Sequence, residues 1–339
     1  MKRNLFNFLA VVLLLAVVAV SCKPEETPLV VSVTGVTLEP TTLVLTVNVT
    51  KALTVTVHPA DAANKIVRWT STDDEIATAH SGNVTAKAPG KAIITVTTDD
   101  GSFSAICRVE VTKPHPAEPE LIWVEGGKFM MGCTDEECWE DGREVPAHQV
   151  TLTGFNIAKN LVTQKQWELV MGSNPSHFKG DNLPVEMVSW QDAQDFIKKL
   201  NELTGKEYRL ATEAEWEYAA RGGNESRGYR YSGSDNINDV AWYKGNAANK
   251  TYPVGTKDPN ELGIYDMSGN VEEWCNDRFG EYTNESQIDP QGPATGLSRV
   301  SRNGSWYDSA KECRVSYRKS MAPGTTSRSQ YRGFRLAHP

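Results

Sequence analysis

Two patterns of hydrophobic and polar positions divide this chain. From residue 31 to 112, short β-branched runs alternate with polar positions, and turn residues such as those at 81–83 separate the runs. Such alternation, with turns every ~8–12 residues, is typical of an antiparallel sandwich. On the last run, Cys107 shares one face with Val109 and Val111, which predicts a buried cysteine. We therefore expect an all-β domain over residues 31–112.

A helical pattern replaces this alternation in a second domain, predicted to span residues 121–339. The three prolines of residues 113–120 predict an extended linker before it. Thr163 and Thr212 each begin a capping-box sequence, Ser189 caps a third helix, and each helical run is followed by glycine. Helical periodicity then fades, so the rest is expected to be loops and short strands. Loops of that length need metal, disulfides or dense polar bonding to hold them.

The first 22 residues have the pattern of an export signal. Two basic residues precede an apolar run at positions 5–20, and small residues lead to Cys22. This pattern resembles a bacterial lipoprotein signal, although Ala19 stands where leucine is usual; a plain secretory signal is the alternative. Lipidation of Cys22 would anchor the mature chain to the cell envelope, at the outer membrane or cell surface, with residues 23–30 as tether.

Charge excludes one class of partner. The formal net charge is −8, and the sequence pI is about 5.4. Binding to phosphate backbones requires a basic face, and the chain has only short runs of lysine and arginine. We therefore expect no nucleic-acid partner.

Five cysteines remain once the lipidated one is set aside, so at least one is unpaired. Cys107 is our candidate for that thiol. Cys133 and Cys138 are predicted to form a local disulfide or a soft-metal pair. For Cys275 and Cys313 the alternatives are a mutual disulfide or a reactive or metal-bound thiol at Cys313. Export favours the disulfides.

An acidic turn motif is the other candidate for chemistry. The sequence DMSGNVEEW at 266–274 places Asp266 and Glu273 on either side of a glycine turn. Two carboxylates in this arrangement can surround a hard cation, with carbonyl oxygens completing the shell; alternatively they bond backbone amides. The six histidines are spread along the chain, so no local iron or zinc motif exists. Ser305 lacks the strand–turn–helix context of a serine nucleophile.

Both domains resemble known families. Residues 31–112 resemble the bacterial immunoglobulin-like group 2 domain, which implies a sandwich acting as a spacer. The second domain resembles the formylglycine-generating enzyme (sulfatase-modifying factor) family, which implies a compact, irregular α+β fold akin to C-type lectins. The motifs that carry these resemblances are GVTLEP at 35–40, VRWTSTDDEIAT at 67–78, GGKFMMG at 126–132, YRLATEAEWEYAARGG at 208–223, NELGIYDMSGNVEEW at 260–274, RNGSW at 302–306 and GFRLA at 333–337.

The resemblance implies a particular chemistry, from which this chain departs. Active family members oxidise a sulfatase cysteine to formylglycine with oxygen and Cu(I) held between two cysteine thiolates. Counted from Gly304, the two positions here are Asp308 and Cys313. A carboxylate is a poor ligand for Cu(I), which favours soft thiolates. We therefore expect a binding or assembly domain rather than a copper oxidase.

Two other activities stay open. The first is an oxidoreductase with Cys313 as redox thiol and Asp308, or a cysteine from elsewhere, as substitute ligand. The second is the non-haem iron branch of the family, for which a histidine cluster is missing.

The resemblance also implies a calcium site. Asp266, Gly269, Val271 and Glu273 match a calcium site of the family, two by side chain and two by backbone carbonyl. We therefore expect a calcium-stabilised domain, presented from a lipid anchor to a protein or glycan partner at the cell surface.

Overall fold

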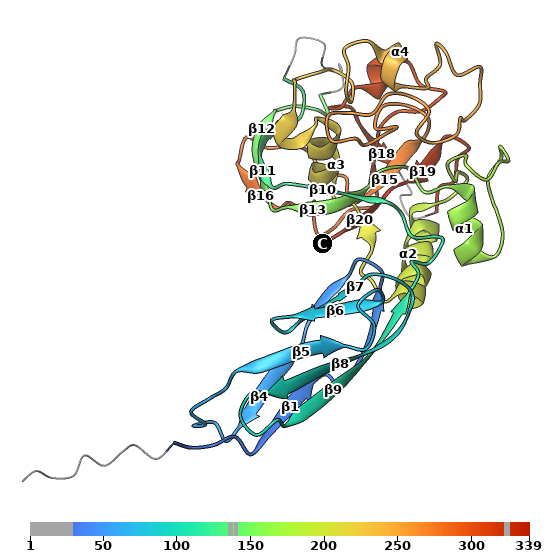
Figure 1. Cartoon of the computed structure of the whole chain (residues 1–339). Coiled ribbons are helices and arrows are strands. Elements are labelled where there is room, and N and C mark those ends of the chain that lie inside the picture. Colours follow the sequence, from blue (N-terminus) through green and yellow to red (C-terminus); the bar gives the residue numbers. More distant parts are fainter. Residues whose placement is uncertain (1–29, 135–137, 139–141, 322–325) are drawn as a thin grey trace, which may run out of the picture. The chain divides into compact units, whose positions relative to one another are not determined.

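The chain folds as two compact units. The computed structural model describes residues 30–134, 138, 142–321 and 326–339. The units divide between Lys113 and Pro114, and Figure 1 shows the β-rich first unit and the larger second unit. The signal and most of the tether predicted for residues 1–30 lie outside the described residues. No helix within the described part of the chain is long and apolar enough to cross a membrane.

The first unit is built from nine strands. Its largest sheet has the order β2-β9-β8-β5, accompanied by the β1-β4 pair and the β3-β7-β6 sheet. Burial alternates along β9, so Cys107, Val109 and Val111 face the core as predicted, and Cys107 is a free thiol. The strands are β1 (Gly35–Glu39), β2 (Thr42–Thr46), β3 (Thr50–Ala52), β4 (Thr54–His58), β5 (Val67–Ser71), β6 (Ala77–His80), β7 (Asn83–Ala86), β8 (Gly90–Thr98) and β9 (Ser104–Thr112).

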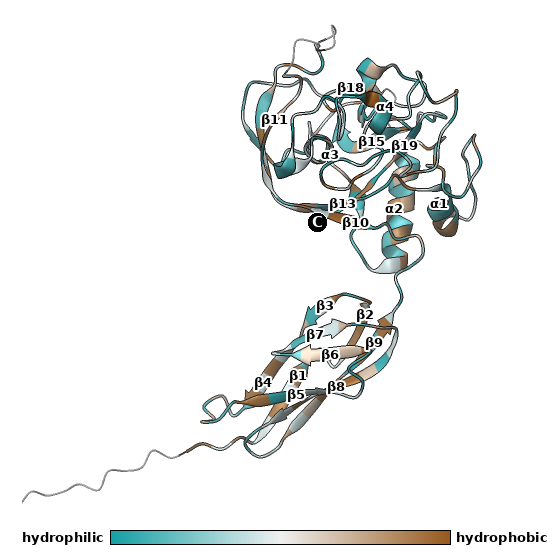
Figure 2. Cartoon of the chain, turned by 45° about the horizontal axis from the view of Figure 1, so that its top comes forward, coloured by the Kyte–Doolittle hydropathy of each residue, from teal (hydrophilic) through white to brown (hydrophobic). Residues whose placement is uncertain are grey.

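The second unit contains three capped helices, which follow its first four strands. They are α1 (Gln164–Met171), α2 (Trp190–Thr204) and α3 (Glu213–Ala220). Each begins with a complete capping box, at Thr163, Ser189 and Thr212, as local sequence predicted. α1 and α2 end at left-handed glycines, whereas α3 ends at Arg221, one residue before Gly222. Hydrophobic and hydrophilic residues interleave along α2 (Figure 2), which buries its apolar face.

Three small sheets complete the second unit. Their orders are β10-β13-β20-β14, β11-β12-β16 and β18-β17-β15-β19. Short helices α4 (Ile237–Val240), η1 (Gly223–Glu225) and η2 (Ala310–Cys313) lie in the loops. The strands are β10 (Leu121–Val124), β11 (Gly127–Met131), β12 (His148–Leu152), β13 (Phe155–Ala158), β14 (Arg209–Leu210), β15 (Glu272–Arg278), β16 (Gln287–Ile288), β17 (Arg299–Arg302), β18 (Arg318–Met321), β19 (Arg332–Phe334) and β20 (Leu336–His338).

The predicted linker 113–120 differs from our expectation, because most of it packs on the second unit. Ala117 is fully buried in the hydrophobic cluster that includes Phe196. Glu118 forms an ion pair with Lys206 and accepts a hydrogen bond from the Tyr208 hydroxyl at 3.0 Å. The backbone carbonyl of Glu120 also accepts a hydrogen bond from the Lys159 amide at 2.9 Å, so several contacts hold the segment against the second unit.

Candidate functional site

The turn after β17 and the short helix η2 position the residues predicted for copper. Asn303 and Gly304 both have positive φ, 90° and 71°, and turn the chain sharply after β17. A Cβ added to Gly304 would lie 2.8 Å from Cys313 Sγ and 2.6 Å from the Glu312 carbonyl oxygen. Only glycine therefore allows this close packing of the turn on Cys313.

Asp308 is held in an ion pair. Its Oδ1 accepts a hydrogen bond from Lys319 Nζ at 2.8 Å, and its Oδ2 accepts one from Ser305 Oγ at 2.5 Å. Lys319 also donates to Glu272 Oε1 at 2.7 Å, so it lies between two carboxylates. Burial alone would lower the pKa of Lys319, but Glu272 and Asp308 raise it well above its usual value. Asp308 is thus bound to a permanent ammonium group.

Cys313 lies in an apolar environment. Its side chain is fully buried and packs with Ile237, Val240 and Ala241. Burial, followed by the charge of Asp308, raises the pKa of the Cys313 thiol well above its usual value. Reactive and metal-bound cysteines require the thiolate and some access to solvent. This cysteine has the properties of a core residue.

One predicted cysteine pairing is present and the other is wrong. The structure contains a disulfide between Cys133 and Cys138, whereas Cys275 and Cys313 are free buried thiols. Cys275 lies on β15 in the hydrophobic cluster around Trp216, and Cys313 lies in a separate cluster. Each sulfur is packed among apolar side chains of its own cluster, so sequence order alone misled the pairing.

The four predicted calcium ligands meet at one point. The carbonyl oxygens of Asp266, Gly269 and Val271 and the carboxylate of Glu273 all face the side-chain nitrogen of Asn303. The Asp266 carboxylate, which we predicted as a ligand, instead accepts hydrogen bonds from the Gly255 amide and Asn270. The carbonyl of Asp266 takes part instead.

This oxygen ring, defined by those three carbonyls and the Glu273 carboxylate, does not fit calcium as it stands. The Asn303 amide occupies its centre, and Arg335 neutralises Glu273 through hydrogen bonds of 3.0 and 3.1 Å. Within the described residues, no group of three or more acidic, histidine or cysteine side chains could hold a metal ion.

A row of five aromatic rings lies beside Asp308. Successive ring centroids are 4.8, 5.6, 5.6 and 5.9 Å apart. Tyr307 is 56% exposed, and the ammonium of Lys244 lies 5.9 Å from its centroid. Sequence reasoning missed this aromatic row, because three separate segments supply it. Its members are His177, Phe178, Trp306, Tyr307 and Tyr331.

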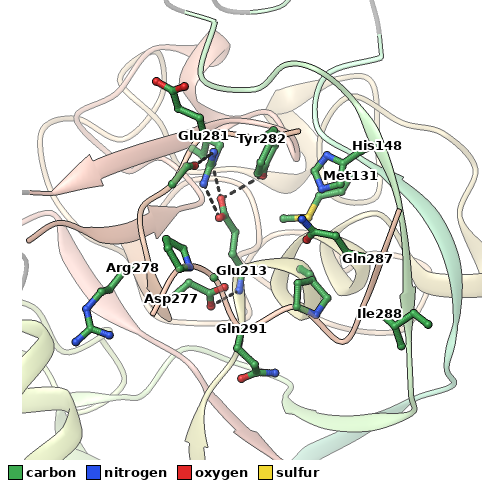
Figure 3. Close-up of a pocket in the computed structure, with 16 residues that line it drawn as sticks. Met131, His148, Glu213, Asp277, Arg278, Glu281, Tyr282, Gln287, Ile288 and Gln291 are labelled. Atoms are coloured by element: carbon green, nitrogen blue, oxygen red, sulfur yellow. Dashed lines mark hydrogen bonds and ion pairs between the residues drawn. The ribbon is translucent and has the colours of Figure 1, made fainter. Parts of the chain in front are cut away.

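A cavity of about 640 Å³ opens at the start of α3 (Figure 3). Asp277 Oδ2 accepts a hydrogen bond from the Glu213 amide at 2.8 Å, and the Glu213 carboxylate pairs with Arg318 at 2.6 and 2.7 Å. No lysine or arginine of the described residues forms an ion pair with Asp277. Burial, and then the charge of Glu213, raises the pKa of Asp277 to about 7. Sequence gave no signal for this carboxyl.

The fold defines a class of protein: an immunoglobulin-like domain followed by an irregular domain of short strands, loops and few helices. Residues 108–339 match the family model of the sulfatase-modifying factor enzyme 1-like domain, and residues 32–109 match that of the bacterial Ig-like domain (group 2). The chain belongs to the sulfatase-modifying factor enzyme 1-like family and carries an N-terminal bacterial Ig-like domain. Both family resemblances are thereby confirmed.

Relatives with different names share this domain. The chain is 38% identical over 248 residues to the chaperone protein LppX of Paenibacillus barcinonensis, covering 58% of this chain and 82% of that protein. It is 30% identical over 287 residues to the formylglycine-generating enzyme of Streptomyces coelicolor, covering 64% and 88%. The solved structure of Treponema denticola variable protein 1 superposes with a TM-score of 0.58 at 31% identity, covering 72% and 98%.

Proposed function

We propose that the second domain is a non-oxidising binding domain that engages a protein partner through the aromatic row. The observation that carries this proposal is the pairing of Asp308 with Lys319. At one of the two ligand positions the carboxylate of Asp308 is paired with the ammonium of Lys319, whose charge opposes Cu(I) binding, and at the other Cys313 is a buried, protonated thiol. The copper pair is thus replaced by an ion pair and a core cysteine.

The aromatic row has the features of an interaction surface. Aromatic side chains supply large contact areas at low conformational entropy and are enriched among residues that dominate binding energy. Tyr307 is exposed, and Tyr331 stacks against it with an interplanar angle of 15°. Trp306 below is 97% buried, so the exposed rings rest on a rigid base. The relative named as a chaperone favours a protein over a glycan as partner.

The rest of the chain fits presentation at a surface. Lipidation at Cys22 would hold the protein in the cell envelope, and the Ig-like domain would act as a spacer between the anchor and the binding domain. The cysteine and its export signal supply the sequence support for this part of the proposal.

The oxidase alternative is tested directly. Incubated with Cu(I), oxygen and a peptide carrying the sulfatase cysteine motif, the protein is expected to form no aldehyde, as measured by mass spectrometry after hydrazide labelling. The three free thiols of the described residues, Cys107, Cys275 and Cys313, should also resist a thiol reagent in the folded protein, because they are buried. Aldehyde formation that Cys313→Ser abolishes would establish the oxidase and reject our proposal.

Binding is tested with a reduced, carboxymethylated protein that stays permanently unfolded, as a probe for chaperone-like capture. Tyr307→Ala and Tyr331→Ala are each expected to weaken binding at least about tenfold, or ~1.4 kcal/mol, measured by isothermal titration calorimetry. The matched control is Trp123→Ala, which removes a 54% exposed ring outside the aromatic row. Equal affinities for wild type and the tyrosine variants would show that this surface is not the binding site.

A further inference from the structure

Asn303 has an unusual position at the centre of the oxygen ring. Its Nδ2 donates to the carbonyl oxygens of Asp266, Gly269 and Val271 at 2.8, 2.8 and 2.7 Å, and Glu273 Oε1 lies 3.4 Å away. The amide nitrogen carries two hydrogens and lies close to three carbonyl oxygens, so at least one hydrogen is shared between two of these oxygens. Four backbone and side-chain oxygens therefore converge on one nitrogen.

Convergence of this kind is the geometry of a cation shell. Calcium is bound by six to eight oxygens at ~2.3–2.6 Å, often with several backbone carbonyls. The nitrogen of Asn303 lies within 2.8 Å of three such carbonyls, at the point where an ion would have to sit. The amide and an ion cannot occupy the ring together.

Charge leads to the same conclusion. Glu273 is fully buried, and a cation in the ring would be its natural counterion. Here Arg335, itself 1% exposed, donates to both oxygens of Glu273 and also to the carbonyl of Ala158 at 2.7 Å. Glu273 therefore has a counterion without a metal, and the wild-type ring does not need a cation to balance its charge.

We propose that the Asn303 carboxamide takes the place of a bound cation, so that this domain keeps the oxygen ring of a calcium site but is stabilised without calcium. The positive φ of Asn303 is a conformation that asparagine tolerates better than most residues, which allows a side chain at this turn. From this backbone position the short amide reaches the ring centre.

The orientation of the amide supports the proposal. Asn303 Oδ1 is buried and has no hydrogen-bond partner among the described residues. Exchanging Oδ1 and Nδ2 would place an oxygen against three carbonyl oxygens, which is worse than leaving one acceptor unpaired. The oxygen ring therefore favours a hydrogen-bond donor at its centre. The Asn303 amide group supplies that donor in place of a cation.

The test compares wild type with Asn303→Asp, an isosteric change that removes both donors and adds a carboxylate to the ring. The melting temperature of the wild-type protein should be the same in EDTA and in millimolar calcium. That of Asn303→Asp should fall in EDTA and rise by several degrees in calcium, because the carboxylate is repelled from the carbonyl oxygens, leaves the ring centre and becomes one more oxygen ligand for an ion there. Native mass spectrometry should find one calcium ion on the variant and none on the wild type.

Asn303→Gly provides a second variant if the aspartate prevents folding. Glycine suits the positive φ and empties the ring, so calcium should bind and raise the melting temperature of this variant also. A wild-type melting temperature that rises with calcium would overturn the proposal. So would two variants that are equally destabilised with and without calcium, because the ring would then not be a cation shell.

Discussion

Glu217→Ala is expected to lower the free energy of unfolding by about 3–5 kcal/mol, because it removes the carboxylate that pairs most closely with the buried guanidinium of Arg302. Glu217 is fully buried and forms an ion pair with Arg302, which is 1% exposed. Its Oε1 also accepts hydrogen bonds from the Gly132 amide and Arg221 Nε, both at 2.8 Å. Although burial acts to raise the pKa of Glu217, Arg221 and Arg302 lower it, so the carboxylate stays ionised.

Urea denaturation of Glu217→Ala and of a matched surface variant measures this effect. Lys165 and Asp181 form an exposed pair 3.8 Å apart, and Asp181→Ala should change stability by less than about 1 kcal/mol. If both variants lost a similar, small amount of unfolding free energy, the buried arginine network would not stabilise the domain as we infer.

Asp277→Asn is expected to stabilise the protein, by up to about 4 kcal/mol at about pH 8. Folding raises the pKa of this carboxyl from 3.8 to about 7, and each unit corresponds to about 1.36 kcal/mol. Between those values the folded state binds one more proton than the unfolded state, so wild-type stability falls as pH rises from about 4 to about 7. Asparagine keeps an oxygen for the Glu213 amide and removes the buried charge.

The pH dependence distinguishes this cause from ordinary repacking. Near pH 4 the variant and the wild type should have similar stabilities, and the difference should grow until about pH 8. The control is Asp258→Asn, at an exposed position, which should change stability little at either pH. A difference of the same size at both pH values would mean that the ionisation of Asp277 is not responsible.

Local features of the fold were predictable from the sequence, because their causes lie within a few residues. The capping boxes at Thr163 and Thr212 and the buried face around Cys107 depend on neighbouring side chains and on period-two alternation. The sheets of the second unit were not predictable. β15 pairs with β17 and in parallel with β19, and such pairings join segments that no sequence periodicity links.

In the candidate site, too, local features were predictable and tertiary contacts were not. Asp308 and Cys313 followed from motif spacing, but the Lys319 contact that decides the chemistry comes from another strand. The pairing of Cys275 with Cys313 was wrong because cluster membership, which places each sulfur, is a three-dimensional property. The aromatic row escaped notice for a related reason, since its rings come from distant segments.

The position of β20 has a consequence for biosynthesis. This strand, Leu336–His338, is an inner strand that pairs with β13 through Ala337 and with β14 through Leu336. β13 also pairs with β10, which is synthesised before it, whereas β14 has only β20 as its partner in this sheet of the described structure. β14 therefore cannot join the sheet until residue 338 has left the ribosome, although about 125 residues separate its synthesis from that of β20.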